Sequence, residues 1–149
     1  PFGVIVIAAA YKTLQVRDSC LCLHLQRAAR AVARHFDDAL RPAGLTSGQF
    51  SLLMALNRPE PPTIGMVAAL LAMDRTTLTA NLKPLERRGL VKIAVDKQDK
   101  RARRLVITSA GRTLLRKAFP IWQKTHAEVE KSLSDISADA LRAALQALA

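Results

Sequence analysis

Five cationic side chains crowd into one short segment in the second half of the chain. They are Lys97, Lys100, Arg101, Arg103 and Arg104. Like charges at this density repel each other, so we expect an anion to offset them. A DNA minor groove can supply that anion, because a narrow groove concentrates negative potential that attracts arginine. Asp99 lies in the same segment, and we expect it to orient a neighbouring arginine. A solvated loop that binds nothing is the alternative.

A second group of polar side chains lies just upstream, in the segment 75–88. Leu78, Leu82 and Leu85 recur at spacings of four and three, which predicts a helix with one apolar face. The opposite face would carry Arg75, Thr76, Thr77, Thr79, Asn81 and Lys83. Threonine and asparagine can hydrogen-bond to base edges in the major groove, so this face suits a helix that reads DNA. The alternative is that these small polar residues only keep an exposed helix soluble.

The positive charge of the chain is concentrated around these two groups. The 149 residues carry a formal net charge of +11. Residues 74–117 hold thirteen lysines and arginines against four acidic residues, a net charge of +9. Such a block predicts a polyanionic partner, and DNA, RNA and a membrane surface are the candidates. Aromatic residues make up only 4% of the chain, which argues against stacking on single-stranded nucleic acid.

The cysteines and histidines do not form a recognisable site. Cys20 and Cys22 are two residues apart, and on a helix this spacing points them in different directions. We therefore expect no disulfide and a reducing compartment, the cytoplasm. Cys20 and His24 share a helical face but make at most half of a metal site, so no metal and no cofactor are predicted.

Neither a catalytic motif nor a membrane segment is evident. The sequence has no Gly-x-Ser-x-Gly, no glycine-rich phosphate loop, no His-Glu-x-x-His and no paired acids, so we do not expect an enzyme. The longest apolar run, residues 4–10, is far shorter than the ~20 residues that span a bilayer. No basic residue precedes it, so it is also a poor signal peptide.

The elements that must position the two polar groups follow from periodicity and capping residues. We expect helices over 18–40, 47–57, 63–71, 75–88, 109–132 and from 138 onward, with strands over 91–96 and 105–108. The residues between the strands would form a long charged hairpin tip. The fold class is therefore mainly helical with a small β-hairpin, a winged helix-turn-helix. Residues 1–17 are an N-terminal extension of unassigned role, and 18–149 are expected to form one domain.

The sequence resembles the MarR family of bacterial winged-helix transcriptional regulators over about residues 18–149. The resemblance is carried by residues 74–91 and 96–111. Its most specific part is Asp99-Lys-Arg101, which matches an Asp-x-Arg pattern, followed by Leu-x-Ile-Thr-x-x-Gly111. The resemblance implies a homodimer with interlocking helices from 18–45 and 109–149. The winged helices, 46–108, would then read a pseudo-palindromic operator in double-stranded DNA.

The same resemblance implies a repressor that a small aromatic ligand or cysteine oxidation releases from DNA. Cys22 is the candidate redox sensor, because its place early in the first helix resembles the peroxide-sensing branch of the family. Two tyrosines that contact the cysteine in that branch are replaced here by Gln26 and Phe36. A ligand pocket could be lined by Phe36, Phe50, Phe119 and Trp122, although each is equally suited to an ordinary core.

A function of another class also has to be considered. A dimer of the same fold could act as a protein-interaction module without operator recognition. The net charge of +9 over residues 74–117 favours the DNA-binding interpretation, because a module that binds only proteins does not need it.

Overall fold

The computed structural model describes the backbone of residues 2–148 and the side chains of residues 11–148. The packing of the chain separates two units, residues 1–34 and residues 35–149. The expected single domain over 18–149 therefore stays a prediction, because residues 18–34 group with the N-terminal helix. Among the described residues, no helix is both long and apolar enough to cross a membrane.

The first unit contains α1 (Phe2–Ser19) and most of α2 (Leu21–Leu40). Cys20 is the single residue between the two helices. The extension that sequence left unassigned is therefore helical over most of its length. The apolar residues of α2 are largely exposed in a single chain: Leu21 is 72% exposed, and Leu25 and Val32 are about two-fifths exposed. Leu40, at the end of α2, is the buried residue of this helix. This apolar stripe is thus mostly uncovered in a single chain.

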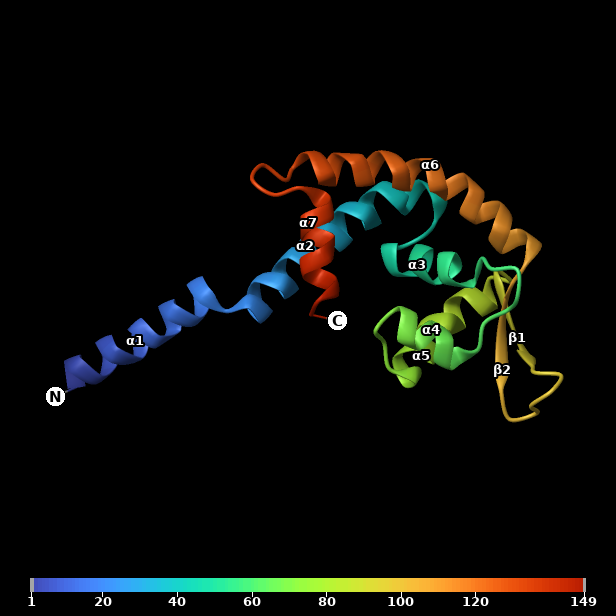
Figure 1. Cartoon of the computed structure of the whole chain (residues 1–149), viewed down its shortest axis with the longest axis horizontal. Helices are drawn as coiled ribbons and strands as arrows, with labels where there is room; N and C mark the ends of the chain where they lie inside the picture. Colours follow the sequence, from blue (N-terminus) through green and yellow to red (C-terminus); the bar gives the residue numbers. More distant parts are fainter. Residues whose placement is uncertain (1, 149) are drawn as a thin grey trace. The chain divides into compact units, whose positions relative to one another are not determined.

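Three short helices follow in the second unit: α3 (Ser47–Leu56), α4 (Ile64–Leu70) and α5 (Arg75–Arg87) (Figure 1). Each begins where a polar side chain caps the first free amides. Thr46 and Gln49 form a reciprocal capping box, Thr63 accepts a hydrogen bond from the amide of Met66, and Asp74 accepts one from the amide of Thr77. The three helices therefore begin within one residue of their predicted starts.

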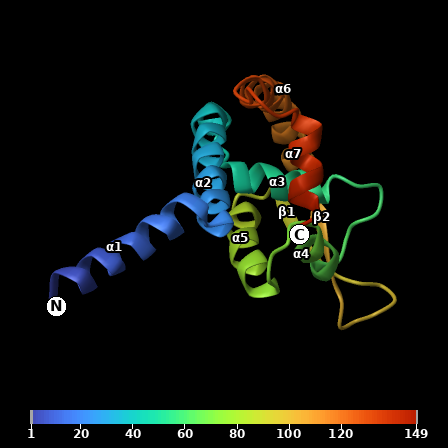
Figure 2. The same cartoon turned by 60° about the vertical axis from the view of Figure 1, so that its left-hand side comes forward.

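Strands β1 (Val91–Val95) and β2 (Arg103–Ile107) pair antiparallel, with Val91 opposite Ile107 and Val95 opposite Arg103. These strands and the loop 96–102 are called the wing. Its second strand begins two residues earlier than predicted, because the amide of Asp96 donates to the carbonyl of Ala102 and extends the ladder. The wing tip projects beyond α4 and α5 (Figure 2). The winged helix-turn-helix fold predicted from sequence is confirmed.

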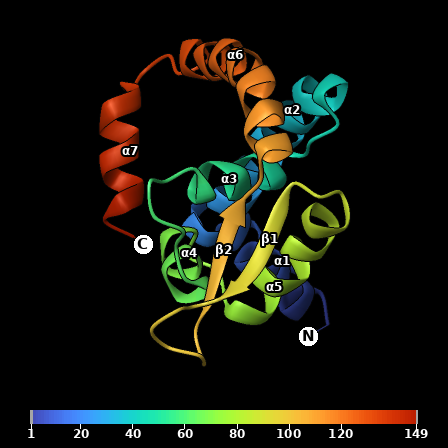
Figure 3. The same ribbon diagram turned by 90° about the vertical axis from the view of Figure 1, so that its right-hand side faces the viewer.

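The core of the second unit is built largely from leucines. Leu53, Leu78, Leu82, Leu85 and Leu105 have no measurable exposure. Burial of a leucine stabilises the fold by about 1.5–3 kcal/mol. These contacts hold β1 beside α5 and β2 beside α3 and α4 (Figure 3).

Two further helices complete the chain, α6 (Ser109–Lys131) and α7 (Ala138–Gln146). Gly111 allows α6 to pass close to the wing, because a Cβ there would collide with the carbonyl oxygen of Leu90. Within the described residues α7 has no buried side chain; Leu145 is 41% exposed, and Leu148, just after the helix, is 66% exposed. The apolar side chains at this end of the chain are therefore also uncovered in a single chain.

Candidate nucleic-acid interface

The exposed face of α5 is set by its buried face. Because Leu78, Leu82 and Leu85 are fully buried, the opposite side of the helix faces solvent. Six predicted site residues lie there; all are exposed except the half-buried Thr79: Arg75, Thr76, Thr77, Thr79, Asn81 and Lys83. The structure thus places the predicted polar face on one accessible surface.

Two threonines of this face have hydroxyl groups engaged within the helix. The Thr77 hydroxyl donates to the Asp74 carboxylate over 2.6 Å, and the Thr79 hydroxyl donates to the Arg75 carbonyl over 2.7 Å. The bonds from Thr77 hold the pKa of Asp74 below its usual range. These threonines therefore retain acceptor lone pairs and methyl groups, while their donor protons are used locally.

Asn81 keeps more of its hydrogen-bonding capacity. Its amide nitrogen lies 3.6 Å from the Met73 sulfur, which is a weak acceptor. The exposed amide could therefore exchange this contact for a stronger partner at low cost. An asparagine amide can form two bonds to one adenine edge, a pairing that discriminates between bases.

The alternation of β2 divides the cations of the wing between two faces. Successive side chains of a strand point to opposite sides, so Arg103 shares a side with Leu105 and Ile107, and Arg104 shares the other with Val106. Three more cations, Lys97, Lys100 and Arg101, are exposed on the loop 96–102. The five predicted wing cations are close in space but not equivalent.

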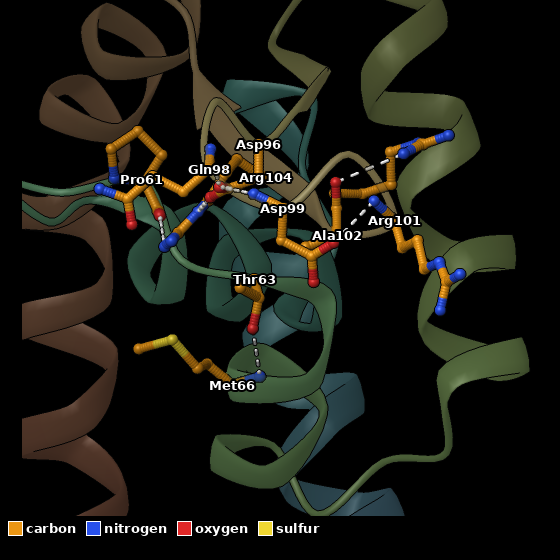
Figure 4. A network of polar contacts seen from close by, with 10 residues as sticks. Pro61, Thr63, Met66, Asp96, Gln98, Asp99, Arg101, Ala102 and Arg104 are labelled. Carbon is orange, nitrogen blue, oxygen red and sulfur yellow. Dashed lines mark hydrogen bonds and ion pairs between the residues drawn. The ribbon is translucent and has the colours of Figure 1, made fainter.

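The main polar contact of the wing involves Asp96, which sequence reasoning did not single out. Its carboxylate accepts hydrogen bonds from the amides of Gln98 (2.8 Å) and Asp99 (2.9 Å) and pairs with the Arg104 guanidinium (Figure 4). The amide of Asp99 and the guanidinium of Arg104 lower the pKa of Asp96 to about 2. A charged side chain with so little exposure must be paired, and this one is held ionised.

The Arg104 side chain also contacts the segment before α4. Its Nη1 donates to the carbonyl oxygen of Pro61 over 3.0 Å, and the next residue, Leu105, donates its amide to Pro62 over 2.9 Å. These contacts connect the wing to the proline-rich segment before α4. The guanidinium expected to contact DNA is thus occupied by the protein itself, which leaves the other four cations for a partner.

Asp99 has a different contact from the one expected. It accepts a hydrogen bond from the backbone amide of Arg101 over 2.9 Å, which shapes the turn. The Arg101 side chain extends away from the Asp96–Arg104 pair (Figure 4). The acid that holds an arginine side chain is therefore Asp96. The signal in the sequence was an acid directly after one strand, two positions beyond the register partner of an arginine of the next strand.

Three of the four residues predicted for a ligand pocket do line one cavity. The cavity measures about 420 Å³ and is bordered by Phe50, Phe119 and Trp122, with Met54 and Arg58 at its edge. The Trp122 ring stacks 6.2 Å from Phe50 and 5.6 Å from Phe119. The fourth, Phe36, is not part of the lining, because it packs against the core instead.

The cysteines form no disulfide. Cys22 is exposed, and its sulfur lies 3.3 Å from the side-chain nitrogen of Gln26, which occupies one expected tyrosine position. Cys20 is half-buried, and its carbonyl oxygen lies 3.0 Å from Nδ1 of His24. Over residues 11–148 no three histidine, cysteine or acidic side chains gather as metal ligands would.

Fold and interface together define a winged helix-turn-helix protein. A sequence model described as the MarR family matches residues 43–102. The DNA-bound transcriptional regulator MosR of Mycobacterium tuberculosis has a similar structure, with 38% identity and a TM-score of 0.79 over 87% of this chain and 93% of that one. The chain belongs to the MarR family. This membership supports the expectation that it is not an enzyme.

Two curated relatives have similar sequences. The transcriptional regulator TtmR of Methylorubrum extorquens is 35% identical over 100 residues, 67% of this chain and 51% of that protein. The organic hydroperoxide resistance transcriptional regulator of Bacillus subtilis is 29% identical over 101 residues, 68% of this chain and 69% of that protein. The chain spans about half the length of the first curated relatives it matches.

Proposed function

We propose that this chain is a sequence-specific regulator of transcription that binds double-stranded DNA. The observation that carries the proposal is the exposed polar face of α5 beside the wing. Within residues 11–148, four cations of that wing have no carboxylate partner. The MosR structure, described as a complex with DNA, supports it. Such a function would place the protein in the bacterial cytoplasm, where its DNA target lies.

In this account α5 is the recognition helix and lies in the major groove. Asn81 and Thr76 would contact base edges, and Thr77 would contribute its methyl group and an acceptor. Arg101 would enter the minor groove from the wing, where negative potential is highest. Lys97 and Lys100 would contact phosphates, which adds affinity without sequence preference.

The protein would act as a homodimer on a pseudo-palindromic operator. The uncovered apolar side chains of α2 and α7, among them Leu21, Val32 and Leu145, support this, because exposed apolar stripes of this kind usually mark interfaces. Two-fold symmetry would present two copies of α5 to successive major grooves. Half-site centres are then expected about 10 base pairs apart, or a multiple of that.

The regulator would repress, and a small aromatic ligand would release it. The aromatic cavity between α3, α4 and α6 supports this signal, because its apolar lining suits a planar ring. Arg58 at its edge would attract a carboxylate on the same ligand. Since α3 contacts both α5 and β2, a ligand there could change how the recognition helix is held.

Oxidation of Cys22 is the second candidate signal. The exposure of its thiol supports it, because an oxidant must reach the sulfur. The relative named as an organic hydroperoxide resistance regulator supports it as well. The Gln26 amide would have to replace the tyrosine hydroxyls as the group that contacts the sulfur.

Selection from random duplexes tests the proposed function. The purified protein is incubated with a randomised duplex pool, and bound DNA is amplified and sequenced over several rounds. The account predicts an inverted repeat that the protein binds at least about a thousandfold more tightly than random DNA. A pool that stays random would contradict it and favour a protein-interaction module of the same fold.

A further inference from the structure

A cleft of about 430 Å³ lies between the wing and the start of α5. Arginines from both elements line it: Arg75 from α5, and Arg101 and Arg103 from the wing. Thr63 and Gly65 form its floor on the side of α4. Three guanidinium groups at one concavity make a strongly positive site, because they add their fields where solvent is partly excluded.

These three charges are not compensated by the fold. Within residues 11–148, none of the three guanidiniums forms an ion pair with a carboxylate. Arg104, the next residue along β2, is paired with Asp96 on the other face of the wing. The chain thus neutralises the arginine that points away from the cleft and leaves unpaired those that line it.

Arg103 is held in place by its own loop. Its Nη1 donates to the carbonyl oxygens of Lys100 (3.0 Å) and Ala102 (3.3 Å). Those two bonds use one end of the guanidinium and leave Nε and Nη2 for another acceptor. A side chain fixed in this way loses less entropy when it binds a ligand.

Arg75 is accommodated by a glycine. A Cβ on Gly65 would lie 3.2 Å from Arg75 Nη2, closer than a comfortable contact. The absent side chain therefore makes room for the guanidinium to lie against α4 at the edge of the cleft.

We propose that this cleft binds one phosphodiester group of the DNA backbone, held by Arg75 and Arg103 together. The inference rests on the proposed function and extends it. Guanidinium groups match phosphate oxygens in charge and geometry. Because one phosphate is held by both the recognition helix and the wing, this contact fixes their common register on the duplex. Arg101, at the mouth of the cleft, remains for the minor groove.

The test replaces single phosphates of the selected operator by uncharged methylphosphonates, one position at a time. For the wild-type protein, one position in each half-site is expected to weaken binding by roughly tenfold, as expected for loss of a charge-assisted hydrogen bond. The variants Arg75→Gln and Arg103→Gln should each bind the unmodified operator about tenfold more weakly. Both should lose their response to that same methylphosphonate.

Arg101→Gln is the matched control from the same cleft. It should weaken binding but keep the response to that methylphosphonate. The inference would be overturned if Arg75→Gln and Arg103→Gln lost their responses at two different phosphates, or if neither lost a response. Either result would leave the proposed DNA-binding function standing. A wild-type protein that selects no operator would overturn the proposed function and this inference with it.

A free anion with phosphate-like oxygens is the alternative occupant of the cleft, and inorganic pyrophosphate is the probe for it. Suppose that millimolar pyrophosphate raises the melting temperature of the wild-type protein but not of Arg75→Gln, and that no operator phosphate responds to methylphosphonate substitution. These two results together would assign the cleft to a free anion. That result would overturn the proposal. Competition by pyrophosphate together with one shared responsive phosphate would support it.

Discussion

Asp96 and Arg104, eight positions apart in sequence, form an ion pair at the loop end of the two wing strands. The carboxylate also accepts two backbone amides, and the guanidinium also donates to the Pro61 carbonyl (Figure 4). The pair therefore joins the wing loop, β2 and the segment before α4. It fixes the position of the wing relative to the helices and withdraws Arg104 from any DNA partner.

Asp96→Asn should loosen the wing without unfolding the helices. Asparagine cannot neutralise Arg104, so one buried contact is lost and the amides of Gln98 and Asp99 lose a charged acceptor. Amide hydrogen exchange should become faster over residues 96–105, while helix content stays the same. Asp99→Asn is the control and should change exchange mainly at Arg101. Unchanged protection in Asp96→Asn would show that the pair does not hold the wing.

The same contact gives the wing a defined response to acid. Because the pKa of Asp96 is lowered from 3.8 to about 2, its stabilising effect is fully present above pH 4. The effect should disappear as the pH falls through about 2. Titration of the Asp96 carboxyl carbon by NMR measures this directly. A midpoint near 4 would mean that the carboxylate is not held by the contacts described.

Asn81 should contribute to specificity. Asn81→Ala should cost ~1–3 kcal/mol of binding free energy on the selected operator and little on random DNA. Arg101→Ala is the contrasting variant and should weaken both duplexes by similar factors, with a modest loss of preference for A·T pairs. Parallel binding curves and footprints on both duplexes measure the ratio. Equal losses for Asn81→Ala would mean that a different face of α5 enters the groove.

The aromatic cavity should respond to ring-bearing carboxylates. Benzoate-type acids are expected to release the operator from wild-type protein, and neutral aromatic analogues should do so less well, because Arg58 attracts the carboxylate. Arg58→Gln should bind DNA normally and need a several-fold higher concentration of acid for release. Gel shifts with a ligand titration provide the measurement. An identical response in Arg58→Gln would remove this residue from the ligand site.

Cys22 and Cys20 should differ in their response to organic peroxide. If oxidation is the signal, Cys22→Ser should bind the operator and ignore peroxide, because it has no thiol to oxidise at the exposed position. Cys20→Ser should respond like the wild type. Mass spectrometry of the peroxide-treated protein identifies the modified residue. Wild-type protein that keeps its DNA under peroxide would exclude this signal.

Local periodicity was enough to predict most of the fold. The spacing of Leu78, Leu82 and Leu85 predicted both the helix and its buried face, and the caps Thr46 and Thr63 marked the helix starts. The same reasoning did not decide what covers Leu21 and Leu145, which are exposed in a single chain. An apolar face can cover a core or await a partner, and periodicity does not distinguish the two.

The candidate site was predictable in its composition but less so in its geometry. Residue type alone suggested that every wing cation faces a partner. The alternation of β2 sends Arg103 and Arg104 to opposite faces, and only the register of the hairpin reveals that Asp96 meets Arg104. The cleft beside Gly65 depends on residues 63–65 lying next to Arg101 and Arg103, which are far from them in sequence.

The salt dependence of operator binding tests the central claim most directly. A dimer that contacts DNA through two copies of α5 and two wings should neutralise about 6–10 phosphates. The slope of log affinity against log salt concentration should then be roughly −5 to −9, and Arg103→Gln should make it less steep by about two, one phosphate for each protomer. A slope near zero for the wild-type protein would contradict DNA binding through the recognition helix and the wing.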